Sequence, residues 1–285
     1  MKILHLSPKG WQEDEQEALR KLGYEVVTEP EDGVDVIISK SVTQMKRSIE
    51  ARKRCPDALT IEFNWDVYFW AITNPRKDEY DYKQYKALCL MSDEVWVPSK
   101  AVQITLKDEK VWGMDSYVMV SWCPQYPLPK DVKIKNGGYA LQALRHNPDY
   151  NIDWYERACK ETGIDYRITW AKEMEESAYR KLLAESGFLV AALYEMSTSG
   201  QFLSEGAAWG KPILASNSPY IGAWDYFGDT IAYYQHDDFE DLKRKIVAMS
   251  KGELKTDVKG AKKRILSMNV DWFAKKVHQR LRELL

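Results

Sequence analysis

The chain has 285 residues and a formal net charge of −2, with 41 Lys and Arg residues against 43 Asp and Glu residues. This balance excludes a global positive field that would draw the protein to nucleic acid or to an anionic membrane, although local patches can still act. The length suits one large domain or two of ordinary size, and no segment approaches the roughly 18 apolar residues of a membrane span.

The first part of the chain alternates short apolar runs with helical patterns, which is typical of parallel α/β units. The predicted strands are 2–7, 24–28, 34–39, 58–63, 93–99 and 116–122. The predicted helices are 12–22, which Gly23 closes at a C-cap, 80–91 and 100–107. The run VDVIIS at 34–39 is almost wholly apolar, as a strand covered on both faces of a parallel sheet requires.

The composition changes between residues 123 and 138, where CPQYPLPKDVKIKNGG holds three prolines and ends in two glycines. Such a stretch is typical of an inter-domain linker. The alternation then restarts, with strands at 138–144, 165–170, 187–193, 211–216 and 229–234, and helices at 151–162, 173–186, after Gly200, at 238–250 and at 270–285. We therefore expect two successive α/β domains, whose ligands bind beyond the carboxyl ends of the strands.

Four cysteines lie far apart in the sequence, without the paired spacing of a zinc site or a redox couple. We expect them to be reduced and mostly buried. The amino-terminal apolar stretch breaks at Pro8, too early for the hydrophobic region of a signal peptide. Together these features predict a cytoplasmic protein.

A cluster of small residues, Ser197, Thr198, Ser199 and Gly200, stands between a predicted strand and a predicted helix. The N–H groups at a helix amino terminus bind phosphate, hydroxyl side chains add donors, and glycine allows a close approach. Plain N-capping by serine or threonine explains the same cluster equally well. Glu205 lies one to two turns into the helix, where a carboxylate could accept hydrogen bonds from a ribose diol.

The stretch YEMSTSGQFLSEGAAWGKPILAS at 194–216 resembles the donor-site signature of glycosyltransferase family 4, the retaining GT-B enzymes, in which E-x7-E is followed by A-x-A-x-GKPVIAS. Three further stretches resemble the family in order and spacing: DEVWVPSKA at 93–101, the segment 217–246, and NVDWFAKKVHQRL at 269–281. The resemblance implies an α/β protein with the GT-B fold, in which two Rossmann-like domains face each other across a cleft. It implies an acceptor domain at 1–125, joined by a carboxyl-terminal helix at 270–285 that crosses back, and a nucleotide-sugar donor domain at 135–267.

The resemblance also suggests roles on the donor side. The family has a glutamate near the donor sugar, eight residues before the position of Glu205; Ser197 stands there, and Glu195 lies two residues earlier. These two residues are therefore alternatives for that role. The family neutralises the donor diphosphate with an arginine and a lysine, and here Arg145 fits the arginine while Asn151 occupies the lysine position.

Further candidates follow two other strands. Asp66, in EFNWDVY, matches a family aspartate, with Asn64 or Trp65 where histidine is common. Asp66 could position the acceptor hydroxyl or take its proton, although a helix N-cap is an equally good interpretation. Tyr220 could line the pocket for the nucleotide base. The chain has no D-x-D motif, so we expect no catalytic metal and no cofactor beyond the nucleotide-diphosphate sugar as co-substrate.

These observations predict a retaining, metal-independent glycosyltransferase that moves a sugar from a UDP- or GDP-linked donor to an acceptor hydroxyl. Asp66, Glu195 and Arg145 are the candidate catalytic residues. The acceptor stays open among a glycan, a lipid, a small molecule and a modified base in nucleic acid, because the first domain carries the weakest resemblance.

A basic stretch at 46–54 is either a solvated helix face or a peripheral contact for an anionic membrane or a nucleic-acid backbone. It contains Lys46, Arg47, Arg52, Lys53 and Arg54 against Glu50. A second hypothesis for the whole protein is a non-transferring GT-B protein, either a nucleotide-sugar epimerase or a binding module. A Rossmann oxidoreductase is disfavoured, because no G-x-G-x-x-G follows a strand near either domain's start.

Overall fold

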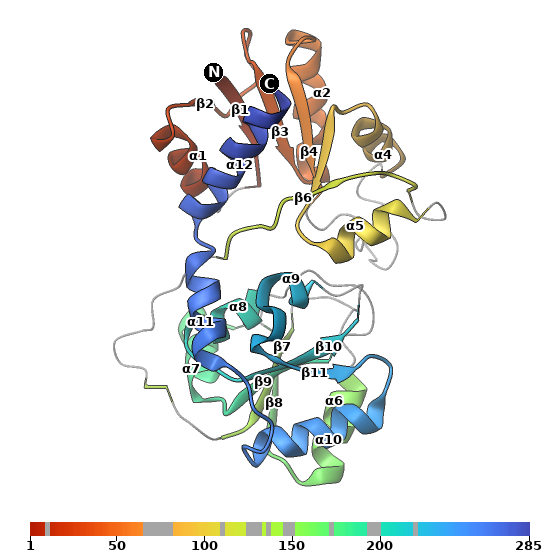
Figure 1. The fold of residues 1–285 in the computed structure, drawn as a ribbon, viewed down its shortest axis with the longest axis vertical. Helices are drawn as coiled ribbons and strands as arrows, with labels where there is room; N and C mark the ends of the chain where they lie inside the picture. The colour runs from red at the N-terminus through yellow and green to blue at the C-terminus, as the bar shows by residue number, and fades with distance from the viewer. Residues whose placement is uncertain are drawn as a thin grey trace. The chain divides into compact units, whose positions relative to one another are not determined.

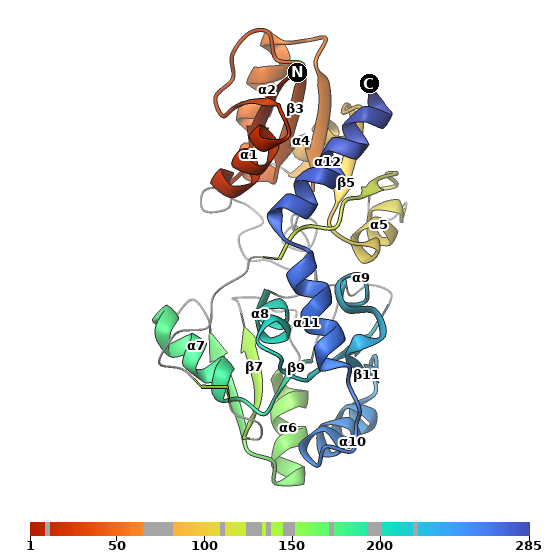
Figure 2. The same cartoon turned by 60° about the vertical axis from the view of Figure 1, so that its left-hand side comes forward.

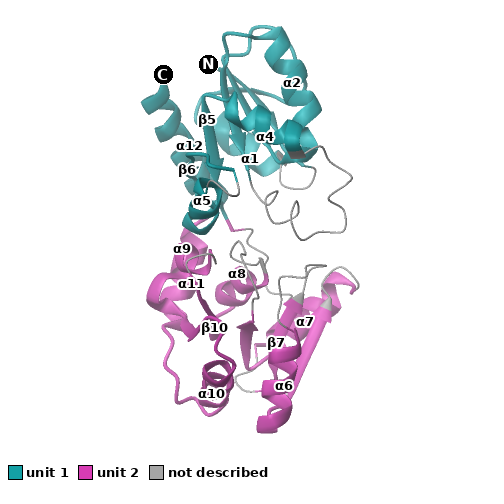
Figure 3. Cartoon of the chain, turned by 90° about the vertical axis from the view of Figure 1, so that its right-hand side faces the viewer, with its two compact units in different colours: residues 1–122, 270–285 teal, residues 123–269 magenta. Residues whose placement is uncertain are grey.

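The computed structural model describes residues 1–8, 12–64, 82–108, 112–123, 133–134, 138–144, 152–170, 174–192, 201–218 and 222–285. The chain forms two compact α/β units (Figure 1, Figure 3), and residues 1–122 with 270–285 make the first and residues 123–269 the second. The boundary thus falls at the amino end of the proline-rich stretch, and the terminal helix belongs to the first unit.

A six-stranded parallel sheet in the order β2-β1-β3-β4-β5-β6 forms the centre of the first unit. Its strands are β1 (Lys2–Leu6), β2 (Glu25–Val27), β3 (Val36–Lys40), β4 (Leu59–Phe63), β5 (Glu94–Val97) and β6 (Tyr117–Val118). The helices of this unit are α1 (Gln12–Lys21), η1 (Val42–Gln44), α2 (Met45–Arg54), α4 (Tyr82–Leu90), α5 (Lys100–Lys107) and α12 (Val270–Leu284).

Side chains of the inner strands alternate between two apolar cores. Ile3 and Ile38 pack in one cluster with residues of α1 and α12, whereas Leu4 and Ile37 pack in another with residues of α2. Burial on both faces explains why these strands are apolar almost without interruption. The helix α12 lies beside α1 (Figure 2) and completes the first cluster.

The second unit contains a five-stranded parallel sheet in the order β11-β10-β9-β7-β8. Its strands are β7 (Ala140–Leu144), β8 (Tyr166–Trp170), β9 (Phe188–Ala191), β10 (Ile213–Asn217) and β11 (Ala232–Gln235). Its helices are α6 (Ile152–Thr162), α7 (Glu176–Glu185), α8 (Gln201–Ala208), α9 (Ala223–Phe227), η3 (Gly228–Thr230), α10 (Phe239–Ser250) and α11 (Val258–Ser267).

The structure corrects the sequence-based elements at several places. The helix α2 was not among the predicted helices, and the predicted strand 229–234 begins within η3. The predicted strand 116–122 is only two residues long as β6, because it pairs with β5 alone and the chain then leaves the sheet. The helix α11 was not predicted, because only Ala261 and Ile265 are buried and the apolar periodicity is correspondingly weak. The side chain of Asp257 caps α11 by accepting a hydrogen bond of 2.9 Å from the N–H of Gly260.

The cysteines Cys55, Cys89, Cys123 and Cys159 are free and buried, as their spacing predicted. Burial raises the pKa of the Cys123 thiol to about 11, so it stays protonated near neutral pH. In the described part of the chain, no helix combines the length and apolarity that crossing a bilayer would require.

Candidate functional site

Most of the predicted site residues lie outside the described residues. They are Asp66, Arg145, Asn151, Glu195, Ser197, Thr198, Ser199, Gly200 and Tyr220. The structure does describe the strands from which the donor-side segments depart: β7 ends at Leu144, β9 at Ala191 and β10 at Asn217. These strands are parallel neighbours in the order β10-β9-β7, so all three segments begin at one edge of the sheet.

Glu205 is the predicted donor-side residue that falls within the described part of the chain. It lies half-buried in α8, which begins at Gln201 directly after the cluster of small hydroxyl residues. The hydroxyl of Tyr179, in the first turn of α7, donates a hydrogen bond of 2.8 Å to Oε2 of Glu205. Sequence reasoning missed Tyr179, because nothing in the local pattern shows which side chain of another helix reaches Glu205.

Two glycines of the motif SEGAAWGKP have structural roles. A Cβ atom on Gly206 would lie 2.1 Å from Cδ1 of Leu189 on β9, so glycine allows α8 to approach the sheet closely. Gly210 has a φ of +78°, a conformation that favours glycine, and its N–H donates to the carbonyl of Ala207 at 2.9 Å. The two glycines fix the position and the end of the helix that carries Glu205.

Lys211, in the same motif, lies at the opposite edge of the sheet, where the strands begin. Its buried Nζ donates hydrogen bonds of 2.6 Å to the carbonyl of Ala184 and 2.5 Å to that of Ser186. These contacts tie the end of α7 to the start of β10. Burial lowers the pKa of Lys211 to about 8. These two hydrogen bonds therefore assign the lysine of GKP to the packing of the domain.

In the first unit, Asn64 follows the carboxyl end of β4 and is fully buried. Its N–H donates to the carbonyl of Trp96 at 2.8 Å, but neither its side-chain oxygen nor its nitrogen has a hydrogen-bond partner among the described residues. Ser41 follows the neighbouring β3 and has a φ of 82°, which is unusual for a residue with a side chain. Orphaned polar groups and backbone strain are both enriched at binding sites, so this edge is a candidate ligand site.

Beside that edge lies a buried cluster of four residues. Glu15 of α1 accepts hydrogen bonds from Lys40 at 2.6 Å and from the indole N–H of Trp122 at 2.6 Å, and it lies 3.0 Å from Nε2 of His5. Burial by itself would raise the pKa of Glu15, but the charge of Lys40 and the hydrogen bonds outweigh it and lower this pKa to about 2. Glu15 is therefore an ionised carboxylate inside the core.

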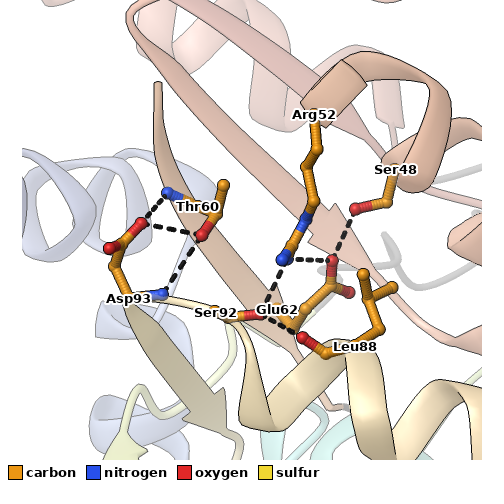
Figure 4. Close-up of polar contacts among 7 residues, drawn as sticks. All are labelled: Ser48, Arg52, Thr60, Glu62, Leu88, Ser92 and Asp93. Atoms are coloured by element: carbon orange, nitrogen blue, oxygen red, sulfur yellow. Dashed lines mark hydrogen bonds and ion pairs between the residues drawn. The ribbon is translucent and has the colours of Figure 1, made fainter. Parts of the chain in front are cut away.

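A second buried carboxylate, Glu62 of β4, lies between α2 and α4 (Figure 4). It accepts hydrogen bonds from Ser48 at 2.6 Å and from Arg52 at 3.0 Å, and Arg52 also donates to Ser92 at 2.7 Å. Asp93 anchors the same region by accepting from the N–H and the hydroxyl of Thr60, each at 2.7 Å. Burial raises the pKa of Glu62 to about 7, although Ser48 and Arg52 oppose the shift.

The arginines of the basic stretch 46–54 have partners within the chain. Besides the contacts of Arg52, Arg47 pairs with Glu29 at 2.9 Å and Arg54 donates to the carbonyl of Pro30 at 2.9 Å. These contacts favour a structural role for the three arginines over a surface for membranes or nucleic acid. Lys46 and Lys53 are exposed.

Among the described residues, no group of three or more His, Cys, Asp or Glu side chains could hold a metal ion. The residues around the predicted donor site lie largely outside that part, so metal independence stays a prediction.

No protein-family model matches the chain, and no curated protein sequence does either. Solved structures are similar along its whole length. Sucrose-phosphate synthase from Thermosynechococcus elongatus has a TM-score of 0.67 at 14% identity, covering 100% of this chain and 96% of that chain. The lipopolysaccharide outer core galactosyltransferase WaaB has a TM-score of 0.65 at 11% identity, covering 100% of both chains. Anabaena HepE, crystallised with UDP and glucose, has a TM-score of 0.67 at 12% identity, covering 99% of this chain and 100% of that chain.

The chain therefore has the α/β fold of GT-B glycosyltransferases, and the fold predicted from the sequence resemblance is confirmed. Sequence identities of 11 to 14% show the fold alone. Membership of family 4 and a retaining outcome stay predictions.

Proposed function

We propose that the protein is a retaining glycosyltransferase that takes a sugar from a UDP- or GDP-linked donor and transfers it to an acceptor hydroxyl without a catalytic metal. The observation that carries this proposal is the place of Glu205 in α8, close to the edge where β7, β9 and β10 end, in a chain with the full-length fold of glycosyltransferases. The neighbours crystallised with UDP, HepE and the pneumococcal O-GlcNAc transferase GtfA, support a nucleotide-sugar donor.

On the donor side, the first N–H groups of α8 and the hydroxyl residues before them would bind the diphosphate, because a helix amino terminus favours anions. Arg145, directly after β7, would add a positive charge, and Glu205 would accept hydrogen bonds from the ribose hydroxyls. The remaining donor-side roles rest on the family resemblance: Asn151 at the diphosphate, Glu195 or Ser197 at the sugar, and Tyr220 at the base.

On the acceptor side, we assign the carboxyl edge of the first sheet. The side-chain amide of Asn64, which has no hydrogen-bond partner in the described part of the chain, could bind an acceptor hydroxyl. Asp66, two residues further on, could orient that hydroxyl or take its proton. The acceptor oxygen would form the new bond to the anomeric carbon as the bond to the diphosphate breaks, and the stabilised diphosphate would leave. A retaining outcome requires both events on the same face of the sugar.

The proposal is tested by incubating the protein with a panel of UDP- and GDP-sugars and candidate acceptors, and by following nucleotide release. We expect one donor class to release its nucleoside diphosphate, to give a product with the donor's anomeric configuration, and to react equally well with EDTA present. An inverted product would overturn retention, and a loss of activity with EDTA would overturn metal independence. Tight nucleotide binding without release from any donor would favour the non-transferring alternative, an epimerase or a binding module.

A further inference from the structure

Tyr179 and Glu205 come from different helices but lie at the same level of the second unit. In a parallel α/β unit, each connecting helix begins near the edge where the preceding strand ends. Tyr179 is the fourth residue of α7 and Glu205 is the fifth residue of α8, so each lies about one helical turn from the start of its helix. Their hydrogen bond of 2.8 Å therefore forms close to the proposed donor site.

The surroundings of this pair are tightly packed. Tyr179 is only 9% exposed, and Phe202 and Leu203 hold α8 in the core on the turn before Glu205. On the next residue, the missing Cβ of Gly206 lets α8 lie against Leu189. Because the backbone of α8 is held in this way, the direction of the Glu205 carboxylate depends on its side-chain rotamer, and the hydrogen bond from Tyr179 contributes to that rotamer.

We propose that Tyr179 is a positioning residue, whose hydroxyl orients the Glu205 carboxylate to accept hydrogen bonds from the 2′ and 3′ hydroxyls of the donor ribose. This inference rests on the proposed function. An ionised carboxylate has about four acceptor positions, and the Tyr179 hydroxyl donates to one of them. A carboxylate held in its binding rotamer before the ligand arrives loses less conformational entropy on binding, which raises affinity.

The test compares dissociation constants for UDP and for 2′,3′-dideoxy-UDP, or for the matching guanosine pair if GDP is the nucleotide that binds. The variants are Tyr179→Phe and Glu205→Gln, with Tyr166→Phe as a matched control. Tyr166 also donates to a glutamate of the second unit, Oε1 of Glu156 at 2.8 Å, but that pair joins α6 and β8. The tyrosine-to-phenylalanine change keeps the ring, so the packing of α7 is preserved.

We expect Tyr179→Phe to weaken UDP binding about five- to tenfold, to leave dideoxy-UDP binding within twofold, and to add no further loss to Glu205→Gln. Tyr166→Phe should leave both constants unchanged. If Glu205→Gln lowers the preference for UDP and Tyr179→Phe does not, the positioning role is wrong and the proposed function stands. An equal loss for both ligands in Tyr179→Phe would also overturn the positioning role. If the protein binds no nucleotide, or if Glu205→Gln keeps the full preference, the ribose role of Glu205 is wrong and the inference fails with it.

Discussion

Lys40 donates hydrogen bonds of 2.6 and 2.9 Å to the two carboxylate oxygens of Glu15 inside the first unit, where both residues are 1% exposed. The ammonium group also lies 4.8 Å from the ring centre of Phe63 and 5.0 Å from that of Phe273. Phe273 belongs to α12, so one buried cation links α1, the sheet and the carboxyl-terminal helix. The buried ammonium of Lys40 therefore contacts the carboxyl-terminal helix as well as α1.

Replacing Lys40 with methionine should lower the free energy of unfolding by about 3–5 kcal/mol, because it leaves the Glu15 carboxylate buried without its cation. Denaturant titration measures this loss. The double variant Lys40→Met/Glu15→Gln should recover most of it, because no buried charge remains. Lys160→Met is the matched control: its ion pair with Glu156 is mostly exposed, so we expect the denaturant midpoint to stay as in the wild type. A Lys40→Met variant as stable as the wild type would contradict this account.

Glu62 predicts a pH dependence of stability. Its pKa is about 7 in the folded protein, against an ordinary value of 4.5, so the folded state binds more protons between these values. The contribution of Glu62 to the free energy of unfolding is complete below about pH 4.5. This contribution, on the order of 1–3 kcal/mol, is lost as the pH rises through 7. Denaturant titrations at pH 5, 6, 7 and 8 should show this decline.

The control is Glu62→Gln, which cannot ionise and should flatten the decline. The groups that influence Glu62 are Arg52, Ser48 and Ser39, and burial also raises the pKa of the nearby Tyr85 and Cys89 well above their ordinary values. These two groups therefore stay protonated over the range tested. Parallel stability curves for the wild type and Glu62→Gln between pH 5 and 8 would show that Glu62 does not titrate there.

Lys211→Met separates the packing role of the GKP lysine from a ligand role. The variant removes two hydrogen bonds from a cation to the carbonyls of Ala184 and Ser186, so we expect a loss of about 1.5–3 kcal/mol in unfolding free energy. The dissociation constant for the nucleoside diphosphate should stay within twofold below the melting temperature. Loss of nucleotide binding at unchanged stability would place Lys211 in the donor site instead.

Asn64→Leu should give opposite results for stability and activity. A buried amide without a hydrogen-bond partner costs about 1–3 kcal/mol, and Asn64 has none within the described ranges, so a leucine of similar volume should leave stability unchanged or raise it. Transfer to the acceptor should fall at least tenfold while nucleotide binding stays as in the wild type. Full transfer activity in this variant would remove Asn64 from the acceptor site.

The sequence predicted the sheet strands well, because a strand buried on both faces requires a continuous apolar run such as 34–39. It failed where tertiary contacts decide the outcome. The helix α11 buries too few residues to show a helical period of apolar residues. The apolar residues after Val118 pack in the core instead of pairing in the sheet. The buried ion pair of Lys40 and Glu15 could not be predicted from the sequence either, because charged residues normally lie on the surface.

The site shows the same division. The family resemblance pointed to Glu205, whereas its partner Tyr179 could be found only from the hydrogen bond that joins α7 to α8. The motif also combined two kinds of residue, since Gly206 and Lys211 have structural contacts that explain their presence. Sequence pattern alone does not separate these from ligand-binding residues.

The most direct test of the central claim is a thermal-shift panel of UDP- and GDP-sugars on the wild type, Glu205→Ala and the control Glu156→Ala. A ligand present at a hundredfold excess over its Kd stabilises the folded state by about 2.7 kcal/mol, which raises the melting temperature by several degrees. We predict such a shift with at least one nucleotide sugar for the wild type and Glu156→Ala, and none for Glu205→Ala. If no nucleotide sugar shifts the wild type at millimolar concentration, the donor site assigned to the second unit is wrong.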